Sequence, residues 1–99
     1  MKDFVYYNSL YDIYSELLTD NERTTFEDYY HEDFSLSEIA EDRDISRSAV
    51  QKTLKNVLEK LEAYEAKLHI YVKNNKLREM LNEDNLDMVK KAIEEILSD

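Results

Sequence analysis

A polar stripe near the middle of the chain carries the residue types that contact nucleic acids. After an arginine, its members recur at i, i+3, i+4 and i+7, which is one face of an α-helix. The stripe consists of Arg47, Ser48, Gln51, Lys52 and Lys55. Arg and Lys bind phosphates or guanine, and Gln pairs with adenine. The alternative is a solvated helix face, and Glu59 and Glu62 one turn further confine any footprint to two turns.

Other chemistries lack the residues they need. The chain has no Cys and no Gly, so thiolate nucleophiles, Cys-based zinc sites, phosphate-binding loops and dinucleotide-binding turns are all excluded. His31 and His69 are far apart and have no partner at metal-ligand spacing. We therefore expect no enzyme activity, no metal and no cofactor.

The stripe lies within SLSEIAEDRDISRSAVQKTLK, which has the pattern of two short helices joined by a tight turn. Ser35 opens a capping box at the start of the first helix, and Ser46 caps the second. Ala40 is the small residue that a helix-turn-helix needs where its helices cross. Apolar supports surround it at Ile39, Ile45, Val50 and Leu54. These features predict a helix-turn-helix with the polar stripe on its second helix.

Two positions depart from the usual helix-turn-helix pattern. Asp44 stands in the turn where glycine is common, although Asp is one of the few other residues that tolerates left-handed backbone. Arg43 stands where an apolar residue is common. The departures weaken the match without removing it.

The whole chain has the composition of an all-α protein. Gly and Pro are both absent, and strands and hairpins usually need them at turns and bulges. Apolar residues recur at helical spacing almost throughout, which predicts helices over 4–18, from 20 to about 31, from 36, from 47 and from 86. Thr19 and Glu22 form a capping box before the second of these helices.

The helix that starts at residue 47 looks long. Its apolar residues alternate at spacings of four and three, an unbroken heptad stripe. They are Val50, Leu54, Val57, Leu61, Tyr64, Leu68 and Tyr71. Asn74 and Asn75 are where we expect this helix to loosen, before a turn at 82–85. We expect residues 1–56 to form the helix-turn-helix head and 57–99 an extension that either folds back as one domain or pairs two chains through residues 57–97.

Charge is distributed unevenly along the chain, whose formal net charge is -10. Residues 1–33 contribute -7, residues 34–56 are neutral and residues 57–99 contribute -3. This acidity opposes binding to nonspecific DNA, although salt screening lets a local basic patch act. The N-terminus lacks the apolar region of a signal peptide, and no stretch is long enough to span a bilayer. We expect a cytoplasmic protein without membrane insertion.

Five groups of residues carry a resemblance through their order and spacing: Leu17-Leu18-Thr19, Tyr29-Tyr30, residues 35–41, residues 45–50 and the LEAYEAKL run at 61–68. In this order and spacing they resemble the YlxM family of small helix-turn-helix proteins. The resemblance covers roughly residues 4–70. It implies a bacterial cytoplasmic protein with a head like region 4 of sigma factors, acting as an accessory or regulatory component of the signal recognition particle pathway.

Two functions follow. In the first, the chain contacts the particle's protein subunit, its receptor or its RNA. In the second, it is a DNA-binding transcriptional regulator whose dimerisation sets the spacing of two recognition helices. A regulator usually carries more basic residues outside the recognition helix, so the acidic composition favours the first.

Overall fold

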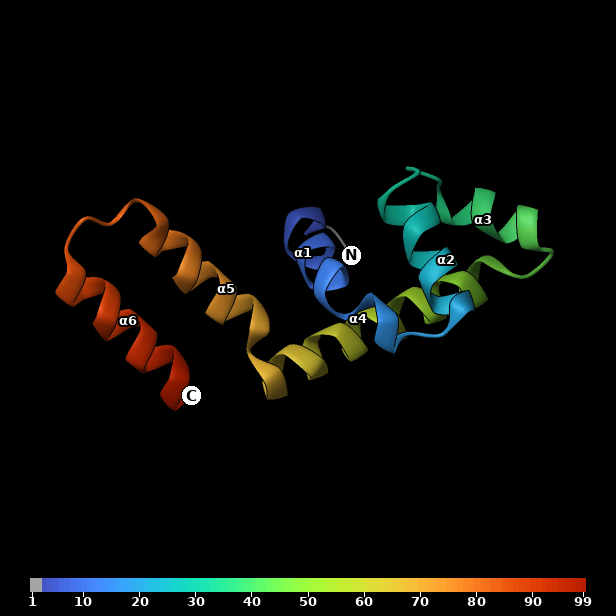
Figure 1. The fold of residues 1–99 in the computed structure, drawn as a ribbon. Helices are drawn as coiled ribbons and strands as arrows, with labels where there is room; N and C mark the ends of the chain where they lie inside the picture. The colour runs from blue at the N-terminus through green and yellow to red at the C-terminus, as the bar shows by residue number, and fades with distance from the viewer. Residues whose placement is uncertain (1–2) are drawn as a thin grey trace. The chain divides into compact units, whose positions relative to one another are not determined.

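The structure, a computed structural model, describes residues 3–99, and these form six α-helices with no strand among them (Figure 1). The helices are α1 (Phe4–Tyr14), α2 (Asp20–Tyr30), α3 (Leu36–Arg43), α4 (Arg47–Leu68), α5 (Ile70–Glu79) and α6 (Leu86–Ser98). Short 3-10 turns, η1 (Ser15–Leu17) and η2 (Met80–Asn82), follow α1 and α5. The all-α prediction is confirmed. None of the helices formed by residues 3–99 combines the length and apolarity needed to cross a bilayer.

The chain divides into two compact units. The N-terminal unit ends at Lys67, and the C-terminal unit spans Leu68–Asp99. In the C-terminal unit, α5 and α6 lie side by side as a helical hairpin (Figure 1). The division of roles between residues 1–56 and 57–99 stays a prediction.

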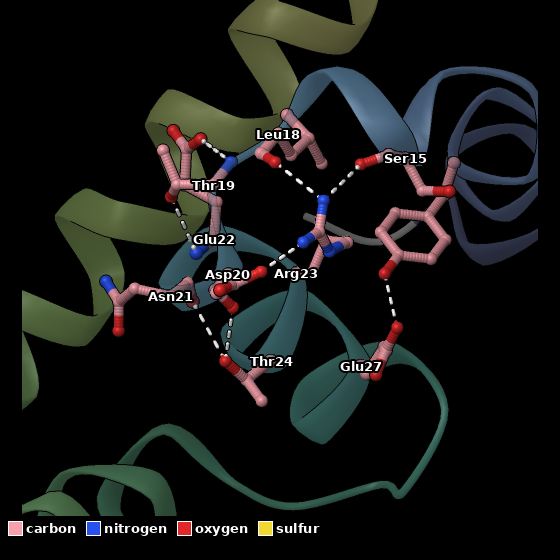
Figure 2. Close-up of polar contacts among 10 residues, drawn as sticks. Ser15, Leu18, Thr19, Asp20, Asn21, Glu22, Arg23, Thr24 and Glu27 are labelled. Carbon is pink, nitrogen blue, oxygen red and sulfur yellow. Dashed lines mark hydrogen bonds and ion pairs between the residues drawn. The ribbon is translucent and has the colours of Figure 1, made fainter.

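Short-range capping determines where three of the helices begin. At the start of α2, the Thr19 hydroxyl accepts from the Glu22 N–H at 3.2 Å, and the Glu22 carboxylate accepts from the Thr19 N–H at 2.9 Å (Figure 2). Ser35 and Glu38 repeat this box at α3, at 3.1 and 3.0 Å. Ser46 accepts from the Ala49 N–H at the start of α4. The predicted caps are confirmed.

The structure corrects the end of the long helix. We expected one helix through Tyr71 that loosens at Asn74 and Asn75, but α4 ends at Leu68 and both asparagines lie inside α5. The break is at His69, whose backbone is left-handed (φ 56°, ψ 24°). Histidine enters that region more readily than most residues. Because the helical hydrogen-bond ladder cannot continue through such a residue, a new helix starts after it.

The core of the N-terminal unit lies along α4. The heptad positions Val50, Leu54, Val57 and Leu61 are fully buried. Fully buried side chains from α1, α2 and α3 share this core, namely Leu10, Tyr14, Phe26 and Ile39. The heptad stripe is therefore covered within the unit as far as Leu61, and the face opposite to it is left for solvent.

Aromatic rings form a stack between α1 and α2. The Phe26 ring lies 4.3 Å from Tyr11 and 4.4 Å from Tyr30, centroid to centroid, with nearly parallel planes on both sides. The Tyr11 hydroxyl donates to the Glu27 carboxylate (Figure 2). Burial and this carboxylate together raise the pKa of Tyr11. The stack fixes α1 on α2 and so completes the support beneath the helix-turn-helix.

Tyr30 carries a buried hydroxyl for which residues 3–99 provide no hydrogen-bond partner. Such a group has lost its water without compensation. We expect Tyr30→Phe to raise the free energy of unfolding at neutral pH by about 1 kcal/mol. Urea unfolding measures the change, and Tyr29→Phe, at a half-buried position, is the matched control, expected within about 0.5 kcal/mol of the wild type.

The Tyr30 hydroxyl also makes the free energy of unfolding depend on pH in the alkaline range. Burial, and then the neighbouring Tyr29 and Tyr7, raise the pKa of Tyr30 to about 12 from its usual 10.0. Between these values the unfolded chain loses the proton while the folded chain keeps it, so stability falls as pH rises through this window. Tyr30→Phe is expected to make that fall shallower. An unchanged slope together with a destabilised variant would contradict both expectations.

Candidate nucleic-acid interface

The turn between α3 and α4 has the geometry that a helix-turn-helix requires. Asp44 is left-handed (φ 55°, ψ 47°). Its N–H donates to the Glu41 carbonyl at 3.3 Å, and the Ile45 N–H donates to the Ala40 carbonyl at 3.0 Å. This pair of bonds is a Schellman motif, which usually has glycine at the left-handed position. Asp44 therefore occupies glycine's place, and Ala40 is buried at the crossing as predicted.

Arg43 connects the end of α3 to α2. Its guanidinium donates to the Thr25 hydroxyl at 2.6 Å and to the Asp28 carboxylate at 2.7 Å, with a third bond to the Asn21 side chain at 3.2 Å. The Arg43 and Asp28 side chains are 19% and 23% exposed, so water weakens the pair only partly. A polar clamp thus stands where other helix-turn-helix proteins have an apolar contact.

The predicted stripe lies on the first turns of α4, and all five of its side chains are exposed. Ser48, Gln51, Lys52 and Lys55 share one face, and Arg47 begins the helix. The opposite face holds the fully buried Val50 and Leu54. Within residues 3–99, Arg47, Lys52 and Lys55 form no ion pair with a carboxylate. Nucleic-acid binding by these residues stays a prediction.

A shallow groove borders the stripe between α1 and α4. Its lining consists of Tyr7, Gln51, Lys55, Leu58, Glu59 and Glu62. Burial, and then the charge and hydrogen-bonding capacity of Glu62, raise the pKa of Tyr7, so its phenol is neutral at physiological pH. An aromatic ring beside an amide and an ammonium group suits an unstacked nucleotide base and its phosphate. The apolar periodicity of residues 4–18 gives no sign that Tyr7 borders the polar stripe.

Two further basic side chains of the N-terminal unit, Lys60 and Arg23, form contacts within the unit. Lys60, on the same helix as the stripe, pairs with Glu22 at 2.7 Å. The hydrogen bond to Glu22 raises the pKa of Lys60. Burial by itself raises the pKa of Glu22, but the hydrogen bonds of Glu22 with Lys60 and Thr19 outweigh burial, so its pKa is lowered. Arg23 pairs with Asp20 and donates to the Ser15 and Leu18 carbonyls at the end of η1 (Figure 2).

Each of the two histidines lies beside a side chain of its own unit. The His31 Nε2 atom is 3.0 Å from the Asn8 side-chain oxygen, and the His69 Nδ1 atom is 2.8 Å from an Asp99 carboxylate oxygen. In the part of the chain that the structure describes, no three His, Cys, Asp or Glu side chains are grouped so as to hold a metal ion.

Comparison with known proteins places the chain among small bacterial proteins. The family model described as "Putative helix-turn-helix protein, YlxM / p13 like" (UPF0122) matches residues 1–99. The UPF0122 protein Teth514_1714 of Thermoanaerobacter sp. is 46% identical over 92 residues, covering 93% of this chain and 74% of the relative. The UPF0122 protein YofM of Lactococcus lactis is 42% identical over 84 residues, covering 81% and 76%. The family match extends over both units.

Proposed function

Because the chain belongs to the UPF0122 family of YlxM/p13-like helix-turn-helix proteins, we propose that it is a regulatory component of the signal recognition particle pathway. In this proposal the first turns of α4 bind the RNA of the particle. The protein acts there by binding and not by catalysis. The choice of pathway rests on the resemblance to YlxM proteins described above.

One observation supports the RNA contact, namely which basic side chains already form ion pairs with carboxylates of the chain. Arg23, Arg43 and Lys60 each form an ion pair with a carboxylate of their own unit. Arg47, Lys52 and Lys55 are exposed on one helix and lack such a partner within residues 3–99. Exposed, uncompensated cations at the start of a helix-turn-helix second helix are suited to phosphates.

The size and surroundings of the basic face favour RNA over a long duplex DNA contact. The face gives way to Glu59 and Glu62, which also line the adjoining groove. Carboxylates at that place repel a continuous phosphate backbone, but they accept hydrogen bonds from base amino groups. RNA loops offer such unpaired bases next to only a few phosphates.

A transcriptional regulator is the second candidate, and the turn geometry favours it. A helix-turn-helix of this shape places its second helix in the major groove, where Arg and Gln read guanine and adenine. Arg47 and Gln51 are both exposed on the first turns of α4. Direct comparison of the ligands separates the two functions.

The experiment is a fluorescence-anisotropy titration across a salt series. Purified particle RNA, particle protein subunit, receptor and random duplex DNA are each titrated with the protein. We expect binding to the RNA, weakened roughly tenfold in Lys52→Ala/Lys55→Ala, because two phosphate contacts are lost. The dependence of log affinity on log salt should become shallower by about 1.5, since each phosphate contact contributes about 0.7 to 0.9.

The control variant is Lys90→Ala/Lys91→Ala, which makes the same change in net charge on exposed positions of α6. It is expected to bind RNA as the wild type does. Equal losses in both double variants would mean that net charge alone governs binding, which contradicts the proposal. Binding confined to duplex DNA would support the regulator instead.

A further inference from the structure

The C-terminal unit leaves a large share of its apolar side chains in water. None of its residues, 68–99, is buried. Eight large apolar side chains of this unit are between 43% and 79% exposed, among them Leu77, Leu81, Leu86, Met88, Ile93 and Leu97. Protein surfaces carry single exposed apolar residues commonly, but a concentration of them marks an interaction site.

The apolar surface of α6 is wider than one neighbouring helix covers. Val89, Ala92 and Ile96 are half-buried, as expected of the side that packs on α5. Leu86, Ile93 and Leu97 fall within about 40° of one another, roughly 90° further around the helix. They form a second apolar stripe, and Leu86 and Leu97 on it are 62% and 79% exposed. A second contact surface is therefore built into α6.

A two-helix unit of this length has too little core to be stable on its own. Chains below about 40 residues usually need a disulfide, a metal or association to stay folded. The chain has no Cys, and within residues 3–99 there is no group of metal ligands. Packing against a further protein surface is the remaining source of stability for the α5–α6 hairpin.

The charges of the hairpin favour a second copy of the same hairpin as the partner. Within α5, Lys73, Lys76 and Arg78 stand against one acid, Glu79, whereas α6 has three acids and two bases, and Asp99 follows it. The pairing of Lys73 with Asp99 at 3.8 Å already uses this complementarity within the hairpin. A two-fold arrangement in which α5 of each copy faces α6 of the other repeats this complementarity between chains.

Electrostatic repulsion between two copies of the chain is weak at the α5–α6 hairpin. The chain as a whole has a formal charge of -10, but residues 68–99 contribute only -2 of it, from five bases and seven acids. Residues 1–33 contribute -7. The hairpin is therefore an apolar surface that repels a second copy much less than residues 1–33 would.

We propose that a second copy of the chain covers this surface, so that two α5–α6 hairpins form a four-helix bundle about a two-fold axis. Its core contains Leu86, Ile93 and Leu97 from each copy. With α6 about 20 Å long, the contact lies at the small end of stable interfaces. The dimer should dissociate at micromolar concentrations.

Sedimentation equilibrium of the full chain, from about 1 to about 500 µM, tests the proposal. We expect the mass to rise with concentration from 11.9 kDa to twice that value. Ile93→Glu/Leu97→Glu should stay at the monomer mass throughout, because two carboxylates would be buried in the bundle. The control is Val5→Glu on α1, an 80% exposed position, which should dimerise as the wild type does.

A charge exchange tests the pairing without relying on variants that could unfold the hairpin. Lys76→Glu/Arg78→Glu gives both α5 and α6 a net negative charge. Glu94→Lys/Glu95→Lys gives both α5 and α6 a net positive charge. Each variant alone should self-associate at least tenfold more weakly than the wild type, and an equimolar mixture should recover the dimer mass. Wild type that stays monomeric across this concentration range overturns the proposal. A mixture no better than its components also overturns it.

Discussion

Phe26→Ala is expected to lower the free energy of unfolding by about 4 kcal/mol, the largest effect of any single substitution considered for this protein. The Phe26 side chain is fully buried, and its ring is stacked between Tyr11 and Tyr30. Removing it deletes buried apolar surface and leaves a cavity that two rigid rings cannot fill. Small domains are stable by only about 5 to 15 kcal/mol, so the variant should lose a large share of the stability of the N-terminal unit.

Urea unfolding followed by near-ultraviolet circular dichroism measures this change, since seven of the eight tyrosines belong to the N-terminal unit. Phe26→Leu is the matched control. It keeps most of the volume and loses the stacking, and about 1.5 kcal/mol is the expected cost. Equal losses in the two variants would show that ring stacking, and not filled volume, accounts for the stability at this position.

Arg43→Ala is expected to cost about 2 to 3 kcal/mol. The substitution removes three hydrogen bonds between α3 and α2 and leaves the half-buried Asp28 carboxylate and the buried Thr25 hydroxyl without this donor. Arg43→Leu restores the residue type that is usual at this position. It should also be destabilising, because the same two acceptors lose their donor.

Arg78→Ala is the control for this clamp. Arg78 is exposed on α5 and donates to the Asn75 side chain within its own helix, so its loss should change the stability by less than about 0.5 kcal/mol. Urea unfolding of the three arginine variants side by side makes the comparison. Arg43→Leu as stable as the wild type would mean that an apolar contact serves equally well and that the clamp adds no stability.

Local chemistry explains why much of the fold could be predicted. A capping box needs only a hydroxyl and a carboxylate three residues apart, so Thr19, Ser35 and the helix starts that they cap are visible in the sequence. The left-handed turn at Asp44 is likewise a short-range property, since few residue types tolerate that backbone. The exposure of the polar stripe followed from its period, once the apolar face of the same helix had been identified.

Contacts between residues far apart in the chain could not be predicted from the sequence. The partners of Arg43 lie 15 to 22 residues earlier in the chain, and nothing in their spacing marks them as a cluster. The groove at Tyr7 arises from two helices separated by some 45 residues in sequence. We expected the helix to loosen at Asn74 and Asn75, but both lie inside α5 and the break is at His69. The helix propensity of asparagine is only slightly low, so it does not decide where a helix ends.

The buried contact between α1 and the last turns of α4 has a consequence for synthesis on the ribosome. The Tyr14 hydroxyl donates to the Glu65 carboxylate at 2.7 Å across 51 residues of sequence. The ring stack of α1 on α2 and the Arg43 clamp use only residues up to position 43, so they are available earlier in translation. Domains fold as their residues emerge from the N-terminus onward. Helix α1 therefore leaves the ribosome first but forms its contact with Glu65 last. The N-terminal unit is completed only when residue 65 has emerged.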